Sequence, residues 1–216
     1  HDELGEICLR RLENEILHQG PDTVAAILAE PVLGAGGVII PPSAFWPGLR
    51  ELCDKYDLLL VADEVITGLG RSGSLFGCRG WGVKPDIMTL AKGLTSGYIP
   101  LGACMINEKI EDAWKEDSPL SVWMQGYTYS GHPVACAAGI AALKLMHSEN
   151  HAENAREVGN YLLQRLLKLK DNFTAIGDVR GKGLMLAIDL VKDRDTKEPF
   201  EPTDEYPPMV SGACES

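Results

Sequence analysis

The sequence lacks the common patterns of a metal site and of a disulfide framework. None of its six cysteines has CxxC spacing, and its five histidines form no HExxH motif. His147 and His151 stand four residues apart, a spacing that a solvent-exposed helix end explains more simply than a metal site. We therefore expect no metal ion, and we expect reduced thiols in a cytoplasmic protein, with several cysteines serving as small apolar side chains.

Long apolar runs and an excess of basic residues are also missing. No stretch approaches the roughly 18 apolar residues of a membrane helix, and no signal peptide opens the chain. The 216 residues include 20 Lys and Arg against 31 Asp and Glu, which gives a formal net charge of -11 at pH 7. Because binding to a phosphate backbone needs clustered Lys and Arg, we expect neither a nucleic-acid partner nor a membrane partner.

Four apolar segments predict the sheet of an α/β fold. They cover residues 24–30, 58–64, 86–92 and 102–107, and helical or long connections separate them. In the first connection, Ser43 can cap a helix that turns its apolar residues toward the core. Continuous apolar strands joined in this way are typical of a largely parallel sheet, flanked by helices and buried on both faces.

Past the fourth strand the pattern changes to two helices and a hairpin. The helices are expected over residues 134–147 and 152–170, and the turn at residues 181–183 would pair two strands after them. We predict an incomplete large domain over residues 1–149 and the beginning of a smaller α+β domain over residues 150–216. Because the chain starts without Met and ends without an element that closes a domain, we expect an internal piece of a longer protein.

The stretch LLLVADEVITGLGRSG, residues 58–73, joins an apolar strand to two adjacent carboxylates and a glycine-rich turn. Its glycines fit GxGxxG, the pattern of a dinucleotide site. The acids directly precede these glycines, however, whereas a dinucleotide fold needs its acid about 20 residues later. The residues that follow are also a poor helix, so that no helix N-terminus would receive a phosphate. A tight turn explains the glycines better.

The same strand also resembles one that ends in the magnesium-binding acid of a nucleotide hydrolase. Such a site requires a GxxxxGK[ST] loop. The nearest candidate, GDVRGKG at residues 177–183, is one residue too short and has Gly after its lysine. A magnesium-dependent hydrolase stays open only if a segment outside this chain supplies the loop.

A third chemistry uses a carboxylate and a lysine at the ends of neighbouring strands. Asp63 ends one apolar strand and Lys92 ends the next, within TLAKGL. In a parallel sheet both side chains would reach the carboxyl edge, where open α/β folds bind ligands. Pyridoxal phosphate needs such a pair, because the lysine amine forms an imine with it and the carboxylate keeps its ring nitrogen protonated. A solvated lysine at a strand end is the plain alternative.

Five blocks of the sequence occur in order: VAAILAEPVLGAGGVIIPP, LLLVADEVITGLGRSGSLFG, GVKPDIMTLAKGLTSGYIPLGA, GYTYSGHPVACAAGIAAL and DVRGKGLMLAIDLV. Together they resemble the class III aminotransferases, which use pyridoxal phosphate on fold type I. The resemblance runs from about Val24 to Val191, and SGYIPLGA and TYSGHP are most similar to the branch that uses pyruvate with ω-amino acids, diamines or amines. It implies transfer of an amino group from such a donor to a keto acid.

The resemblance implies roles for individual residues. Lys92 would hold the cofactor as a Schiff base and move the substrate proton, and Asp63 would pair with the pyridinium nitrogen. Val65, two residues further and so expected on the same strand face, would pack against the ring. Thr128 would reach the phosphate of the cofactor held by the other subunit of a homodimer with shared active sites. Glu30 resembles the carboxylate that neutralises a substrate-binding arginine, although a buried or capping role fits it equally.

The chain departs from the family pattern in two respects. Ile66 stands where many members have Gln, which can bond the cofactor hydroxyl. The chain is also about half the usual length, so the phosphate-cradling turn, the aromatic residue that stacks on the ring and the substrate-binding arginine belong to segments outside it. The alternatives to an aminotransferase are therefore an aminomutase of the same family and an inactive fragment or pseudoenzyme.

Overall fold

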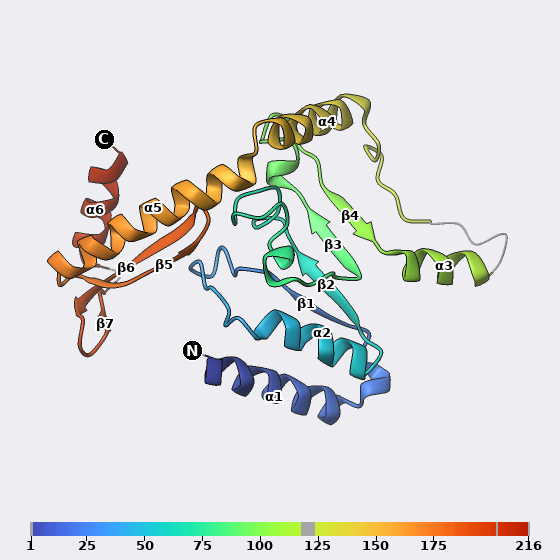
Figure 1. The fold of residues 1–216 in the computed structure, drawn as a ribbon, viewed down its shortest axis with the longest axis horizontal. Helices are drawn as coiled ribbons and strands as arrows, with labels where there is room; N and C mark the ends of the chain where they lie inside the picture. Colours follow the sequence, from blue (N-terminus) through green and yellow to red (C-terminus); the bar gives the residue numbers. More distant parts are fainter. Residues whose placement is uncertain (1, 118–123, 202, 216) are drawn as a thin grey trace.

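The computed structural model describes residues 2–117, 124–201 and 203–215. A four-stranded sheet with two helices beside it forms the first part, and a long helix with a three-stranded sheet forms the second (Figure 1). The α-helices are α1 (Asp2–Gln19), α2 (Phe45–Lys55), α3 (Glu108–Asp117), α4 (Pro133–Ser148), α5 (His151–Asn172) and α6 (Tyr206–Glu215). The strands are β1 (Ala26–Ala29), β2 (Leu59–Asp63), β3 (Ile87–Leu90), β4 (Ala103–Ile106), β5 (Ile176–Lys182), β6 (Met185–Asp193) and β7 (Glu198–Pro199).

The first sheet has the strand order β1-β2-β3-β4, and the predicted largely parallel α/β fold is confirmed. β1 pairs with β2 and β2 with β3 in parallel, whereas β4 returns antiparallel to β3. The register places Asp63 opposite Thr89, and Thr89 opposite Cys104. One row of side chains therefore crosses three strands close to the end of β2.

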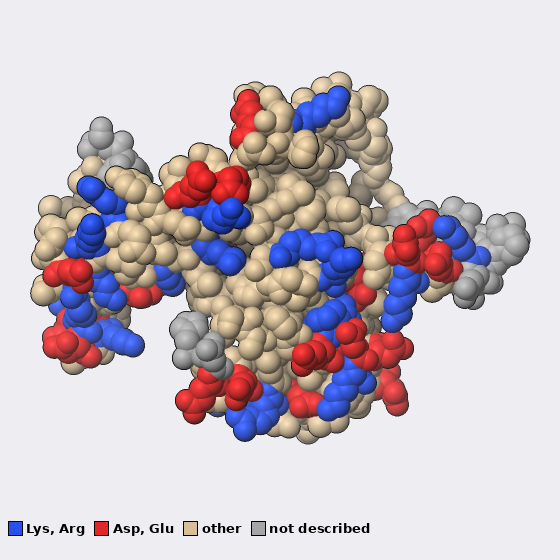
Figure 2. Space-filling view, viewed as in Figure 1, with Lys and Arg blue, Asp and Glu red and all other residues tan. Residues whose placement is uncertain are grey.

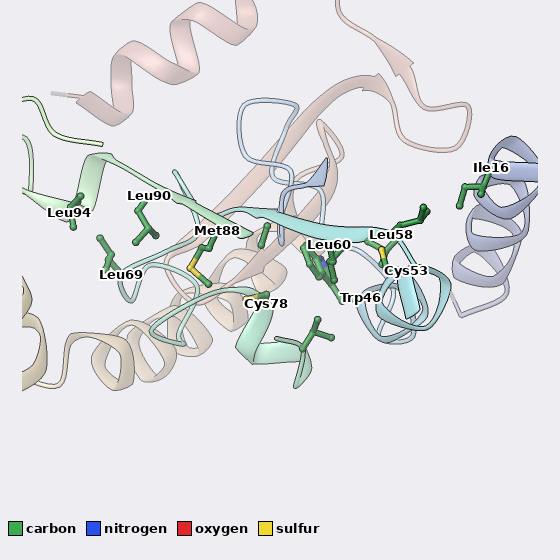
Figure 3. Close-up of a cluster of buried hydrophobic side chains, with 13 residues drawn as sticks. Ile16, Trp46, Cys53, Leu58, Leu60, Leu69, Cys78, Met88, Leu90 and Leu94 are labelled. Atoms are coloured by element: carbon green, nitrogen blue, oxygen red, sulfur yellow. The ribbon is translucent and has the colours of Figure 1, made fainter. Parts of the chain in front are cut away.

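The hydrophobic core lies on one face of this sheet. Trp46, Leu49 and Cys53 follow one another at helical spacing along α2 and belong to one buried cluster with Leu58 and Leu60. Figure 3 shows Trp46 and Cys53 beside these two leucines. Each fully buried side chain of this size contributes about 1.5–3 kcal/mol to folding. α1 packs in turn against α2, on the side away from the sheet (Figure 1).

The prediction that both faces of the sheet are buried was wrong for this chain. The side chain of Leu28 in β1 is 66% exposed, and every residue of β4 is exposed. Leu28 and Ile106 belong to the row through Val61 and Ile87. This row lies between two core-facing rows, one with Leu60 and one with Ala62 and Met88. Since α2 covers only the core-facing side, the opposite face of β1 and the whole of β4 remain open.

Most helices lie where the sequence predicts them, with differences at their ends. The helices expected over 134–147 and 152–170 are confirmed as α4 and α5. α2 begins at Phe45 with Ala44 at the N-cap position, so the prediction that Ser43 caps this helix was wrong. None of the helices in the described part of the chain is long and apolar enough to cross a membrane.

The second sheet docks on the first part of the chain through the tip of its hairpin. β5 and β6 pair antiparallel, as predicted, but Lys182 still pairs with Met185, so the turn consists of Gly183 and Leu184. The Leu184 N–H donates to the Arg71 carbonyl at 3.0 Å. A side chain at Gly183 has no room, because an added Cβ would lie 2.4 Å from the carbonyl carbon of Ser72. The predicted domain boundary near residue 150 stays a prediction.

Two longer side chains reinforce this docking. The Lys182 ammonium lies 4.3 Å from the centre of the Trp81 ring, an arrangement that favours the cation. Burial nevertheless lowers the pKa of Lys182. Arg180 in β5 donates from Nε to the carbonyls of Gly37 at 2.9 Å and Val38 at 3.2 Å, in the loop after β1. Asp178 and Asp189 hold the other side of its guanidinium.

Charged residues of both signs are mixed over the face shown in Figure 2. Lys and Arg stand beside Asp and Glu over α1 and α2, and again at the outer end of the second sheet. Because opposite charges lie next to one another, this face has no extended region of electrostatic potential of one sign.

Asp86 joins the helical layer to the sheet. Its Oδ2 accepts the Leu60 N–H and Arg50 Nη1, both at 2.8 Å, and its Oδ1 accepts Asn107 Nδ2 at 2.8 Å. Burial alone would raise the pKa of the Asp86 carboxyl, but the Leu60, Arg50 and Asn107 hydrogen bonds hold that pKa below its usual value. The charged form of Asp86 therefore stabilises the fold.

We expect Asp86→Asn to lower the free energy of unfolding by about 2 kcal/mol at pH 7, because it leaves buried donors and Arg50 with weaker partners. Since the folded pKa lies below the unfolded value, this contribution is complete above about pH 4 and is lost as the pH falls through the folded pKa. Urea denaturation at several pH values measures it. The control is Asp54→Asn, which removes only an exposed partner of Arg50. Equal losses in both variants would contradict the assignment.

Candidate active site

Lys92 lies just past β3, at the predicted edge of the sheet but not in the strand itself. β3 ends at Leu90, and Lys92 begins the short helical turn Lys92–Leu94 with φ 43°. A positive φ is uncommon for a residue with a side chain and marks a position where the surroundings impose the backbone. The side chain is exposed, and its Nζ makes no hydrogen bond or ion pair with a described residue. Its amine is thus available to a ligand.

Asp63 ends β2, as predicted, and its carboxylate is held on one side only. Its Oδ1 accepts the Val65 N–H at 3.0 Å and the Thr89 hydroxyl at 3.1 Å. These two donors use both lone pairs of that oxygen. No described residue donates to Oδ2, so this half-buried oxygen remains an open acceptor.

Glu64, the neighbouring acid, turns to the opposite side and is fully occupied. Its side chain is buried, and it accepts the Thr67 hydroxyl at 2.5 Å and the N–H groups of Gly77 and Cys78 at 2.8 Å. Burial, with the nearby Glu64 charge, raises the pKa of the Cys78 thiol. Adjacent carboxylates thus have separate tasks: Asp63 is open to a ligand, whereas Glu64 fixes the loop after β2.

The glycines after Glu64 form a tight turn, as the sequence analysis favours. Gly70 and Gly73 have φ values of 98° and 82°, which other residues rarely adopt. An added Cβ would lie 3.3 Å from the Ala152 nitrogen and 3.2 Å from the Arg156 Cβ, respectively. These glycines allow α5 to approach the loop. The short helical turn that follows, Cys78–Trp81, is not a phosphate-binding helix.

A cavity of about 1320 Å³ opens beside Lys92. The exposed residues of β4 form one part of its wall, and the loop of residues 125–131 forms another. Thr128 lies within this loop and is exposed, next to the lining residues Tyr127 and Tyr129. Asp63 is not among the residues that line this cavity. Met124, which precedes this loop, is 88% exposed, and the neighbouring Trp123 lies outside the described residues.

Two further predicted site residues flank Asp63. Val65 lies beyond β2, which ends at Asp63, so the prediction that it shares a strand face with Asp63 was wrong. It is tied to Asp63 instead through its own N–H. Glu30 is half-buried just after β1, and its Oε2 accepts the Gly34 N–H at 3.0 Å. Ile66 packs on Gly34, where an added Cβ would lie 2.6 Å from Cδ1 of Ile66.

Thr89 is the site residue that the sequence analysis missed. Its hydroxyl donates to Asp63, and its carbonyl accepts the Glu64 N–H at 3.0 Å. The available signal was a hydroxyl side chain among the apolar residues of a predicted strand, three positions before Lys92. Within the described residues, no group of three or more His, Cys, Asp or Glu side chains could hold a metal ion.

Comparison with known proteins decides the family. The family model described as aminotransferase class-III matches residues 1–206. The chain belongs to the class III aminotransferases. The predicted resemblance is therefore confirmed over nearly the whole chain.

Named class III relatives and a solved structure are similar in the same region. The chain is 41% identical over 216 residues to a diaminobutyrate–2-oxoglutarate transaminase of Halomonas elongata, covering 98% of this chain and 45% of that protein. It is 43% identical over 200 residues to a putrescine–pyruvate aminotransferase of Pseudomonas aeruginosa, covering 92% and 43%. An amine transaminase structure from an uncultivated Pseudomonas species, in its PLP-bound internal aldimine form, matches with a TM-score of 0.93, 51% identity and coverage of 98% and 48%. The chain spans about half the length of these relatives.

Proposed function

We propose that this chain is part of a pyridoxal-phosphate-dependent aminotransferase. The enzyme would move an amino group from an ω-amino acid, a diamine or an amine to a keto acid such as pyruvate, so that the donor leaves as a carbonyl compound. Membership of the class III aminotransferases and the transaminase relatives support this assignment. The observation that carries it is the open Oδ2 of Asp63, one strand away from an unpaired lysine.

These residues fit pyridoxal phosphate. A carboxylate with one saturated oxygen and one open oxygen can accept a hydrogen bond from a protonated ring nitrogen. An exposed amine without an ion pair can bond covalently to an aldehyde carbon. When bound, pyridoxal phosphate supplies a ring that accepts electrons from the substrate carbon.

Each side chain then has a limited task. Lys92 anchors the cofactor and later carries a proton from the substrate carbon on Nζ. Asp63 supplies negative charge to the ring nitrogen, and Val65 packs against the ring. Glu30 stays near the substrate end of the site through the turn that Gly34 closes.

Thr128 is proposed to act in a second subunit. It stands exposed in a loop that also presents Met124, Tyr127 and Tyr129 to solvent. Exposed apolar side chains gathered in one loop are typical of an interface. In a two-fold homodimer, each Thr128 hydroxyl would reach the phosphate at the partner's Lys92, which makes two shared sites.

The first test replaces the anchoring amine. We expect Lys92→Ala, made in the full-length protein, to lower transamination by at least about 10³-fold, because both the covalent anchor and the proton carrier are lost. Peptide mass analysis after incubation with pyridoxal phosphate and borohydride should find the cofactor mass on Lys92 in the unsubstituted protein and no cofactor mass in Lys92→Ala. The control, Lys84→Ala, changes an exposed lysine before β3. Cofactor mass on another lysine would refute the assignment.

The second test removes the charge of Asp63 while keeping its shape. We expect Asp63→Asn to retain part of its cofactor binding but to slow turnover about 10²–10³-fold, a common effect of losing preorganised electrostatic stabilisation. Steady-state kinetics together with absorbance titration of the cofactor separates the two effects. Turnover close to normal would show that Asp63 only closes the end of β2.

The third test asks which subunit supplies Thr128. A purified heterodimer pairs a Thr128→Ala chain with a Lys92→Ala chain. If Thr128 serves the partner's site, the intact lysine meets the intact threonine, and one complete site remains. If Thr128 serves its own subunit, each site has one defect. Because we propose that Thr128 serves the partner's site, we expect the heterodimer to have about half of the unsubstituted dimer's activity. A heterodimer activity no higher than half that of the Thr128→Ala homodimer would exclude shared sites.

A further inference from the structure

The Asp63 carboxylate is oriented by one side-chain donor, the hydroxyl of Thr89. The other donor to the same oxygen, the Val65 N–H, belongs to the backbone two residues further on. The last torsion of an aspartate is broad, so a single backbone donor leaves the carboxylate free to swing about that one bond. A second donor from a different strand fixes the plane of the group.

Thr89 is well suited to this task. It is half-buried in β3, directly opposite Asp63 in the parallel register. Its β-branched side chain has few rotamers, so its hydroxyl is held in place by the strand. Its carbonyl also accepts the Glu64 N–H at 3.0 Å, which prevents the two strands from sliding where β2 ends.

We propose that Thr89 is a positioning residue that determines which oxygen of Asp63 faces the cofactor. By saturating Oδ1 together with the Val65 N–H, it leaves Oδ2 as the acceptor for the ring nitrogen and aims it out of the sheet. Lys92 follows three residues later on the same segment. Thr89 therefore sets the carboxylate and the amine relative to one another. This inference rests on the proposed function.

The chain contains a matched comparison for this hydrogen bond. Thr67 donates its hydroxyl to the adjacent acid, Glu64, at 2.5 Å, and both side chains are buried. Thr67→Val and Thr89→Val remove the same chemical group from a threonine–carboxylate pair. A loss of general stability would affect both variants, whereas a loss of orientation at Asp63 would affect only Thr89→Val.

The experiment compares Thr89→Val, Thr89→Ser and Thr67→Val in the full-length protein. We expect Thr89→Val to bind pyridoxal phosphate about 10-fold more weakly by absorbance titration and to lower kcat about 10-fold, as loss of a hydrogen bond to a charged group implies. The amine KM should stay within about twofold, because Thr89 does not reach the substrate. Thr89→Ser, which keeps the hydroxyl, should restore both values to within about threefold.

Thr67→Val should lower the melting temperature yet leave the cofactor Kd and kcat per folded molecule unchanged. The inference is overturned if Thr89→Val matches the unsubstituted protein, if Thr89→Ser fails to restore binding, or if Thr67→Val weakens the cofactor equally. Failure of the unsubstituted protein to bind pyridoxal phosphate would overturn the proposed function itself, and the Thr89 assignment with it.

Discussion

The parallel pairing of β2 with β3 is the constraint on which the site depends. It sets Asp63 opposite Thr89, and the chain then needs only three more residues to reach Lys92. The pairing is held by core side chains such as Leu60 and Met88 and by the Asp86 carboxylate, which bonds the backbone of Leu60. Packing on one face of the sheet thereby fixes the positions of Asp63 and Thr89 on the other face.

The two adjacent acids at the end of β2, Asp63 and Glu64, have different tasks on the two sides of the sheet. Asp63 keeps one oxygen open, whereas Glu64 is buried and accepts three donors. A carboxylate buried without donors would be strongly destabilising, so the loop from Thr67 to Cys78 is shaped to supply them. The glycine turn within this loop also admits α5, which carries the second sheet. Residues 58–73, with their carboxylates and glycines, thus serve a ligand site on one side and hold the fold together on the other.

The sequence predicted the strands and the pair Asp63 and Lys92 because apolar runs and their polar ends are local signals. It could not predict that Lys92 adopts φ 43°, which depends on how the chain leaves β3. Thr89 was missed because its importance arises only from the register with Asp63. Burial was overestimated for Leu28, since apolar composition indicates that a side chain avoids water but not which element covers it. Val65 was misplaced because β2 ends at Asp63, two residues before it.

The hydrogen bonds from Arg180 to the loop after β1 have a consequence for the order of folding. Arg180 stands 143 residues after Gly37, so its bond closes one of the longest loops in the chain. Contacts of such large sequence separation form after local ones, because the entropy of loop closure must first be overcome. The backbone at Val38, with φ 54°, is thus held by a partner that lies 142 residues later in the sequence. During synthesis, the loop that follows Glu30 therefore cannot form these bonds until Arg180 has been made.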